Sequence, residues 1–303
     1  MKDFYIDKYH PSKKGPFIFS HRLKEGLEAM GLGFNQKSQN RLSIITGSYL
    51  EGANNMLRLD GLYLDSGNTM GKSSKLNRPI FNCYRKFDHI VFQSEYAKNV
   101  YEAFTEEKQP NTIIYNGAPD IFFKECEPVD KPEGFEKVII ASSKWRRHKR
   151  IEEAISAFKD ERLKDVALVI MGGYKNIDQK NIFCLPKVHP EELPKYYQMA
   201  DGQIHLCWLA CCPNTVVECL ASRLPVLCSH NGGTKELVKD DGIIIKLEED
   251  YEYGTMVPLY RPPKVDINII VEGVLKLLEM PKIKEREDLK ISHCASRYSE
   301  LFK

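Results

Sequence analysis

Short apolar runs rich in β-branched residues alternate with amphipathic segments along this chain. The apolar runs predict buried strands, and the segments with apolar residues three and four apart predict helices that cover them. We expect strands at residues 42–46, 89–93, 112–115, 138–142, 167–171, 204–208, 225–229 and 242–246. We expect helices at residues 20–30, 95–104, 150–158, 190–200, 215–222, 234–238, 267–280 and 285–298.

This alternation predicts an α/β protein with parallel sheets joined by helical crossovers. A length of 303 residues fits two domains of ~150 residues each. Residues 123–135 are rich in proline and acids, and the strand–helix rhythm restarts after them. We therefore expect two Rossmann-like, doubly wound domains, over residues 1–130 and 131–284, that face a central cleft. Ligands of such sheets bind beyond the carboxyl ends of the strands.

Charge and hydropathy exclude several classes of protein. The chain carries 44 basic and 42 acidic side chains, a net charge of +2, and this balance argues against nucleic acid as a partner. Its apolar runs are far shorter than the ~18 residues of a membrane span. The first residues lack the apolar stretch of a signal peptide. We expect no transmembrane segment and a cytoplasmic location.

The nine cysteines predict no metal site. Their spacing contains no C-x-x-C pair, and five of them lie between Cys207 and Cys228, mostly in apolar segments. Cysteine in such segments behaves as a small hydrophobic residue. Reduced thiols and no bound zinc are the expectation.

A cluster of cations follows the strand expected to end at Ser142. It contains Lys144, Arg146, Arg147, Lys149 and Arg150, just before a predicted helix. A helix N-terminus favours anions, so we expect Lys144 and Lys149 to hold a diphosphate there. A solvated basic turn is the alternative. A second is contact with RNA or DNA phosphates, for which Trp145 would be the stacking platform.

A second signal is the segment from Pro213 into the next predicted helix. Asn214 or Thr215 is expected to cap that helix, and free N–H groups at its start, including that of Val216, can bind phosphate. Glu218 is expected in its first turn, where it could accept hydrogen bonds from two vicinal hydroxyls. An acid that only complements the helix dipole is the alternative.

A third signal is the turn Asn231-Gly232-Gly233 before a helix capped by Thr234. Two glycines allow the backbone to approach a ligand closely. A plain turn would have the same sequence.

Together these segments resemble the donor-binding domain of GT-B glycosyltransferases of family 4, over residues 138–240. The family's stretch G-R-L-x-x-x-K-G-x-x-x-L-I-x-A-F is matched by Ser143-Lys144-Trp145, Lys149-Arg150 and residues 154–158. Its E-A-M-A-x-G-x-P-V-V-x-S-x-x-G-G-x-x-E-L-V is similar to the run from Glu218 to Val238. The resemblance implies that Lys149 binds phosphate, that Glu218 binds the ribose hydroxyls and that the base lies near Val188.

The sequence departs from the family's pattern at two positions. Lys144 stands where the family has arginine, which keeps the charge and loses the bidentate fork. Ala210 lies eight residues before Glu218, where the family usually has an acid near the donor sugar. This second departure puts donor-sugar recognition in question.

The first half of the chain resembles the family less closely. Lys13-Lys14-Gly15-Pro16 is similar to the family's glycine loop, and Asn116-Gly117 with Phe122 to the motif that closes its first domain. Arg58 and Asp60 would then face the cleft; a local Arg–Asp pair is the alternative. We also expect the helix within residues 285–303 to pack back on the first domain.

The sequence and the resemblance predict a glycosyltransferase that moves a sugar from a nucleotide-diphosphate sugar to a glycan or glycoconjugate acceptor. We expect retention at the anomeric carbon, and no metal or other cofactor, because fixed cations face the diphosphate. The catalytic candidates are Asp60, Arg58 and Lys149. The donor-binding candidates are Gly15, Lys144, Lys149, Val188, Asn214, Thr215, Val216 and Glu218.

Two alternatives stay open. Ala210 favours a catalytically weak protein that binds sugar nucleotides. An enzyme that glycosylates modified nucleic-acid bases is the other, and the balanced charge argues against it.

Overall fold

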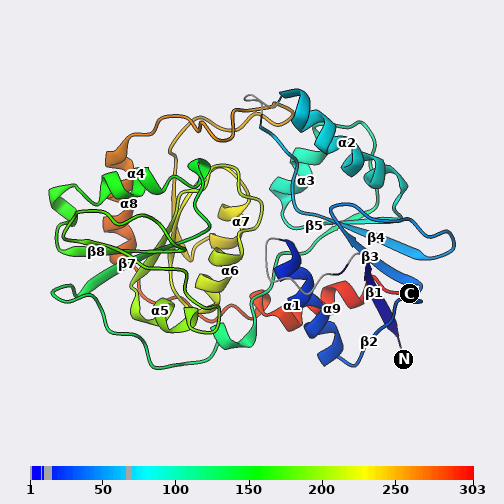
Figure 1. Cartoon of the computed structure of the whole chain (residues 1–303), viewed down its shortest axis with the longest axis horizontal. Helices are drawn as coiled ribbons and strands as arrows, with labels where there is room; N and C mark the ends of the chain where they lie inside the picture. The colour runs from blue at the N-terminus through cyan, green and yellow to red at the C-terminus, as the bar shows by residue number, and fades with distance from the viewer. Residues whose placement is uncertain (1, 8, 10–15, 66–69) are drawn as a thin grey trace. The chain divides into compact units, whose positions relative to one another are not determined.

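The computed structural model of the chain describes residues 2–7, 9, 16–65 and 70–303. The glycine-loop candidates Lys13, Lys14 and Gly15 lie outside the described residues. The chain divides into two compact units, each built on a parallel sheet (Figure 1). Unit 1 comprises Met1–Pro119, Glu252–Pro258 and Glu287–Lys303, and unit 2 comprises Asp120–Tyr251 and Leu259–Arg286.

The sheet of unit 1 has six described strands in the order β2-β1-β3-β4-β5-β6. All of its strand pairs are parallel, so their carboxyl ends share one edge. The strands are β1 (Asp3–Asp7), β2 (Gly33–Phe34), β3 (Asn40–Ile44), β4 (Asn54–Leu59), β5 (His89–Phe92) and β6 (Asn111–Ile113).

Helices bury both faces of this sheet. Met56 of β4 lies in a core with α1 (Pro16–Ala29) and α9 (Ile291–Ser299). Its neighbour Leu57 lies in the opposite core, with α2 (Met70–Lys86) and Tyr101 of α3 (Glu95–Glu102). Side chains of a strand alternate between faces, so a strand covered on both sides is buried throughout, as β4 is. The C-terminal helix α9 is part of the core of unit 1.

The sheet of unit 2 also has six described strands, in the order β12-β11-β10-β7-β8-β9. From β7 the chain adds β8 and β9 on one side, and then β10, β11 and β12 on the other. The strand order therefore reverses between β7 and β10. The strands are β7 (Lys137–Ser142), β8 (Val166–Met171), β9 (Ile182–Cys184), β10 (Gly202–His205), β11 (Val226–Ser229) and β12 (Gly242–Ile245).

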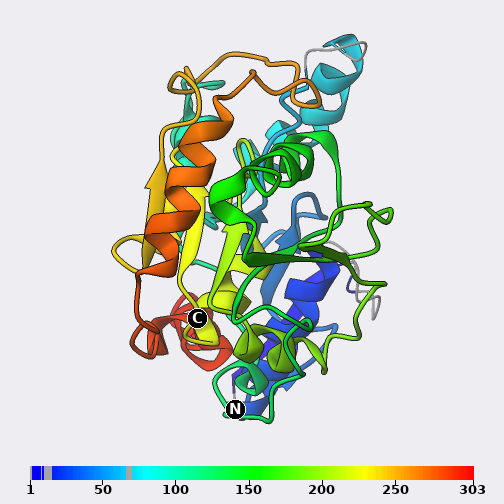
Figure 2. The ribbon, with the colours of Figure 1, turned by 90° about the vertical axis from the view of Figure 1, so that its left-hand side faces the viewer.

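Two layers of helices cover this sheet. On one face, α4 (Ile151–Ala157) and α8 (Ile267–Leu278) share a core with the strands, and Figure 2 shows α8, in orange, beside them. On the other lie α6 (Asn214–Ala221) and α7 (Thr234–Val238), while α5 (Leu193–Met199) precedes β10. Single 3-10 turns are η1 (Asp120–Phe122), η2 (Arg147–Lys149), η3 (Glu161–Leu163) and η4 (Glu287–Leu289).

Each predicted strand coincides with a strand of these sheets, and the predicted α/β class with parallel sheets is confirmed. The sequence analysis missed β1, β2, β4, β9 and α2. Asn54, Asn55 and Arg58 interrupt the apolar pattern of β4, although the sheet buries all three. Pro79 lies inside α2 and hides its helical pattern.

The chain passes from unit 1 to unit 2 between Pro119 and Asp120, earlier than the expected boundary near residue 130. Contacts with α5 explain this position. The ring of Phe122 lies 5.9 Å from that of Tyr197, and the N–H of Cys126 donates to the side chain of Gln198 at 3.0 Å. The acidic stretch is therefore anchored on unit 2. Within the described residues, no helix is both long and apolar enough to span a membrane.

Candidate donor site

The candidate site begins at the carboxyl ends of β7 and β10, where the strand order of unit 2 reverses. In doubly wound sheets, such a reversal opens a crevice that binds ligands. The basic turn of residues 143–150 follows β7, and residues 206–213 lead from β10 to α6. Since β7 and β10 are parallel neighbours, both loops leave the sheet at the same edge.

Backbone hydrogen bonds join the three segments that the sequence analysis singled out. The N–H of Trp208 donates to the carbonyl of His148 at 2.8 Å, and the N–H of Gly233 donates to the carbonyl of Ala210 at 2.7 Å. Gly232 has a φ of +91°, and a Cβ there would lie 2.7 Å from the oxygen of Ala210. Glycine is therefore required for this approach. The basic turn, the loop before α6 and the Gly-Gly turn form one site.

The five cations of the basic turn differ in whether their side chains have a partner in the structure. Arg147 pairs with Glu152 at 2.7 Å in an exposed position, and Arg150 pairs with Glu248 at 2.8 Å in a buried one. Arg146 donates to the hydroxyl of Tyr260 at 3.3 Å. In the described part of the chain, the side-chain ammonium groups of Lys144 and Lys149 have no ion-pair or hydrogen-bond partner. These two are the cations available to an anion.

Lys149 supplies the positive charge beside two neutral histidines. Burial lowers the pKa of His148 to about 4, and the charges of Lys149 and Arg146 act in the same direction. Burial, Lys149 and His148 together hold the pKa of His205 well below its ordinary value. Both imidazoles are therefore neutral at pH 7. Desolvation raises the pKa of the Cys211 thiol to about 12, so this cysteine does not compete for the lysine as a thiolate.

The start of α6 differs from the expectation. Pro213 is its N-cap, and neither Asn214 nor Thr215 caps it through a side chain. The N–H of Val216 already donates to the carbonyl of Pro213 at 3.0 Å, so the expected free donor at Val216 is wrong. No described carbonyl outside α6 accepts from the N–H of Thr215. At the start of α6, the backbone N–H available to a phosphate is therefore that of Thr215 and not that of Val216.

Glu218 lies in the second turn of α6, because the helix begins at Asn214; the expectation of the first turn is wrong. Its side chain is buried. Val188 follows β9, which β8 separates from β7 in the sheet. The described contacts do not bring Val188 to the basic turn.

The sequence of this unit matches a known family. The model of the family described as "Glycosyl transferases group 1" matches residues 125–291, which is more than half of the chain. The chain belongs to this family. It is a glycosyltransferase, and the candidate site lies within the matched residues.

Solved structures identify the fold of this glycosyltransferase as GT-B. Sucrose-phosphate synthase from Thermosynechococcus elongatus matches with a TM-score of 0.67 at 13% identity, over 100% of this chain and 95% of that one. HepE from Anabaena, in complex with UDP-glucose, matches with a TM-score of 0.58 at 13% identity, over 100% and 96%. An α,α-trehalose-phosphate synthase from Burkholderia xenovorans, in complex with glucose-6-phosphate, matches with a TM-score of 0.59 at 11% identity, over 94% and 76%. No curated protein is significantly similar in sequence.

The two catalytic candidates of unit 1, Arg58 and Asp60, lie in a polar cluster at the end of β4. Arg58 forms an ion pair with Asp60, and its side chain is 1% exposed against 22% for Asp60. Its Nη2 donates to Asn116 at 2.7 Å and to Gln93 at 3.3 Å, and the guanidinium lies 3.8 Å from the ring centre of Phe19. Arg58 is therefore inaccessible to substrate. The structure contains the local Arg–Asp pair that the sequence analysis gave as the alternative.

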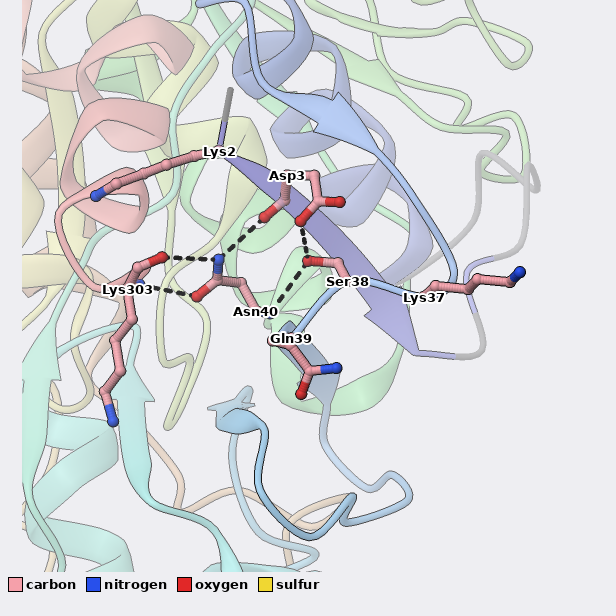
Figure 3. Close-up of a pocket in the computed structure, with 7 residues that line it drawn as sticks. All are labelled: Lys2, Asp3, Lys37, Ser38, Gln39, Asn40 and Lys303. Atoms are coloured by element: carbon pink, nitrogen blue, oxygen red, sulfur yellow. Dashed lines mark hydrogen bonds between the residues drawn. The ribbon is translucent and has the colours of Figure 1, made fainter.

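A pocket of about 450 Å³ lies elsewhere in unit 1, at the amino ends of β1 and β3 (Figure 3). The side chain of Ser38 donates to the carboxylate of Asp3 at 2.7 Å, and Asn40 donates to the carbonyl of Asp3 at 3.1 Å. Substrates of doubly wound sheets bind at the opposite edge. We therefore do not assign this pocket to the glycosyltransferase reaction. In the described residues, no three His, Cys, Asp or Glu side chains gather to hold a metal.

The sequence analysis missed Glu248 and the role of Arg150. The sequence analysis grouped Arg150 with the other cations of the basic turn, although its side chain is fully buried against Glu248. The run Glu248-Glu249-Asp250 after β12 was the available signal. A run of acids at a strand end does not show which one turns inward, and only the tertiary structure identifies Glu248.

Proposed function

We propose that this glycosyltransferase is a retaining, metal-independent enzyme of family 4 that takes its sugar from a nucleotide-diphosphate donor. One observation carries the proposal: Lys149 lies unpaired among the described residues, where β7 and β10 reverse the strand order. A fixed ammonium group at this edge is the chemistry that a leaving diphosphate requires.

The diphosphate contacts Lys149 and the more exposed Lys144, with the N–H of Thr215 as a further donor. These groups favour negative charge, and α6 adds the positive end of its dipole. Because the charge is built into the protein, no divalent ion is needed to neutralise the leaving group. Retention at the anomeric carbon is part of the proposal and rests on the resemblance to family 4.

The nucleoside part of the donor contacts Glu218 and the segment around Val188. A carboxylate in α6 can accept hydrogen bonds from both ribose hydroxyls. Ala210 lies on the loop before α6 and faces the sugar, which it contacts without a charge. In unit 1, Asp60 is the candidate catalytic carboxylate, and Arg58 holds it in position. The acceptor is a glycan or a glycoconjugate.

Calorimetric titration of the purified protein with UDP, GDP and ADP tests the donor site. We expect one of the three to bind with a Kd in the micromolar to millimolar range and to keep its affinity in excess EDTA. The matching hexose conjugate, incubated with the protein for hours, should release nucleoside diphosphate. Binding without any release would identify a protein that binds donors and does not turn them over. No binding of any nucleoside diphosphate to the folded protein would contradict the proposal.

A further inference from the structure

We infer that Arg150 and Glu248 are positioning residues of the donor site. Their buried ion pair fixes the position of the basic turn relative to the Gly-Gly turn. This inference rests on the proposed function, in which Lys149 contacts the diphosphate. It adds two residues that touch no substrate and whose side chains lie beneath the loops that do.

Glu248 connects two segments through its two carboxylate oxygens. Its Oε2 accepts from Nη2 of Arg150 at 2.8 Å. Its Oε1 accepts from Nδ2 of Asn231 at 2.9 Å and from the hydroxyl of Ser229 at 3.3 Å. The side chains of Arg150 and Glu248 are 0% and 3% exposed. Every polar contact of this carboxylate is thus made inside the protein, where ion pairs are weakly screened.

Arg150 fixes the residue that would bind phosphate. It has a φ of +56°, in the left-handed region that favours glycine, and the family stretch quoted above has glycine at this place. Its N–H donates to the carbonyl of Arg147 at 3.0 Å, which closes η2, and its Nη1 donates to the carbonyl of Pro263 at 3.1 Å. The buried guanidinium therefore holds the backbone directly after Lys149.

Asn231 carries the connection to the second segment. Besides Glu248, its Nδ2 donates to the carbonyl of Glu249 at 2.9 Å, and its Oδ1 accepts from the N–H of Tyr251 at 2.9 Å. Gly232 and Gly233 follow immediately and contact Ala210. A single carboxylate thus links the turn of Lys149 to the loop before α6.

The energetics of buried charges make this role testable. Removal of one partner leaves an uncompensated charge in the interior and destabilises the fold, whereas removal of both charges with the volume kept is often neutral. Stability should therefore recover in the double variant. The relative position of the two turns should not recover, because it depends on the bond between Arg150 and Glu248. A merely structural pair predicts that stability and affinity recover together.

The test compares Arg150→Met, Glu248→Gln and the double variant by thermal unfolding and by calorimetric titration with inorganic pyrophosphate. Pyrophosphate is the probe because it reports on the phosphate site without any base or ribose. Glu152→Gln is the matched control: it breaks the exposed ion pair with Arg147 in the same turn. We expect this control to bind pyrophosphate within twofold of wild type.

We expect both single variants to melt at lower temperature and to bind pyrophosphate at least tenfold more weakly. The double variant should recover most of the melting temperature and stay at least tenfold weaker. If the single variants do not fold, the double variant, with no unpaired buried charge, carries the test. A double variant within twofold of wild-type affinity overturns the inference. Failure of the wild type to bind pyrophosphate and every nucleoside diphosphate instead contradicts the proposed function.

Discussion

The N–H of Trp208 donates a 2.8 Å hydrogen bond to the carbonyl of His148, which joins the loop after β10 to the basic turn after β7. The bond leaves Lys149, the next residue, at the junction of the two loops. The indole N–H of Trp145, in the same turn, donates to the carbonyl of Met171 at the end of β8 at 3.0 Å. The ends of three neighbouring strands therefore hold the turn that presents Lys149.

The first prediction tests Lys149 as the phosphate ligand. Lys149→Ala should weaken nucleoside diphosphate binding by about 1.5–3 kcal/mol, the range for a hydrogen bond to a charged group. Arg147→Ala is the control, because Arg147 lies in the same turn and its charge pairs with Glu152 in solvent. Calorimetry of both variants gives the comparison. Equal affinities for wild type and folded Lys149→Ala would remove Lys149 from the site.

The second prediction concerns Glu218. If its carboxylate accepts from the ribose hydroxyls, Glu218→Ala should weaken the free nucleotide and the sugar nucleotide alike, by about 1.5–3 kcal/mol. Inorganic pyrophosphate, which has no ribose, should bind as it does to wild type and serves as the control ligand. A variant that loses pyrophosphate affinity as well would show a disturbed site rather than a lost ribose contact.

The third prediction concerns Ala210. Ala210→Glu restores the acid that family members usually carry eight residues before Glu218. It should change turnover or the ranking of donor sugars, and keep nucleotide affinity within tenfold, or ~1.4 kcal/mol. Steady-state rates with several sugar conjugates, together with nucleotide titrations, measure the two effects. Loss of nucleotide binding in the folded variant would mean that position 210 does not face the sugar.

The fourth prediction concerns the ion pair of unit 1, in which Arg58 is buried and Asp60 is 22% exposed. Asp60→Asn keeps the shape of the side chain and leaves the charge of Arg58 without a carboxylate. We expect the free energy of unfolding to fall by about 3 kcal/mol, because the buried charge of Arg58 is left without its carboxylate. Glu161→Gln removes the partner of Lys164 in an exposed pair and should cost less than about 1 kcal/mol. Urea unfolding measures both, and equal effects would contradict a buried pair at Arg58.

The fifth prediction is a pH dependence that arises at His148. Its pKa is about 4 in the folded protein, because burial and the nearby cations disfavour the charged ring, against 6.5 ordinarily. Between these values the unfolded chain binds a proton that the folded chain does not, so the free energy of unfolding falls as the pH falls. From pH 7 to pH 5 this residue should contribute a loss of about 2 kcal/mol.

His148→Phe keeps a ring against Tyr260 and removes the titrating group. Urea unfolding at pH 7 and pH 5 should show a loss about 2 kcal/mol smaller in this variant than in wild type. The control variant His189→Gln removes a histidine whose side chain is 68% exposed, and His148→Phe should show the smaller loss of the two. An unchanged loss in His148→Phe would show that the ring titrates normally in the folded state.

Much of the fold follows from local pattern. β8 is apolar along its whole length and β7 from Val138 to Ala141, because helices cover both faces of the sheet. Such a run predicts a strand without any knowledge of its partners. β4 could not be predicted in this way, because Asn54, Asn55 and Arg58 bind partners that are distant in sequence. Asn54 donates to the carbonyl of Leu301 at 2.9 Å, and no local pattern contains that residue.

The sequence by itself determined the chemistry of the candidate site: the cations after β7, the acid in α6 and the Gly-Gly turn, each marked by residue types close together in the chain. The tertiary structure decided which of them remain available. Lys149 and Arg150 are adjacent cations, yet Arg150 pairs with Glu248, 98 residues away, and is fully buried. Burial and pairing depend on which strand ends meet at an edge, and strand order is a long-range property that residue spacing does not contain.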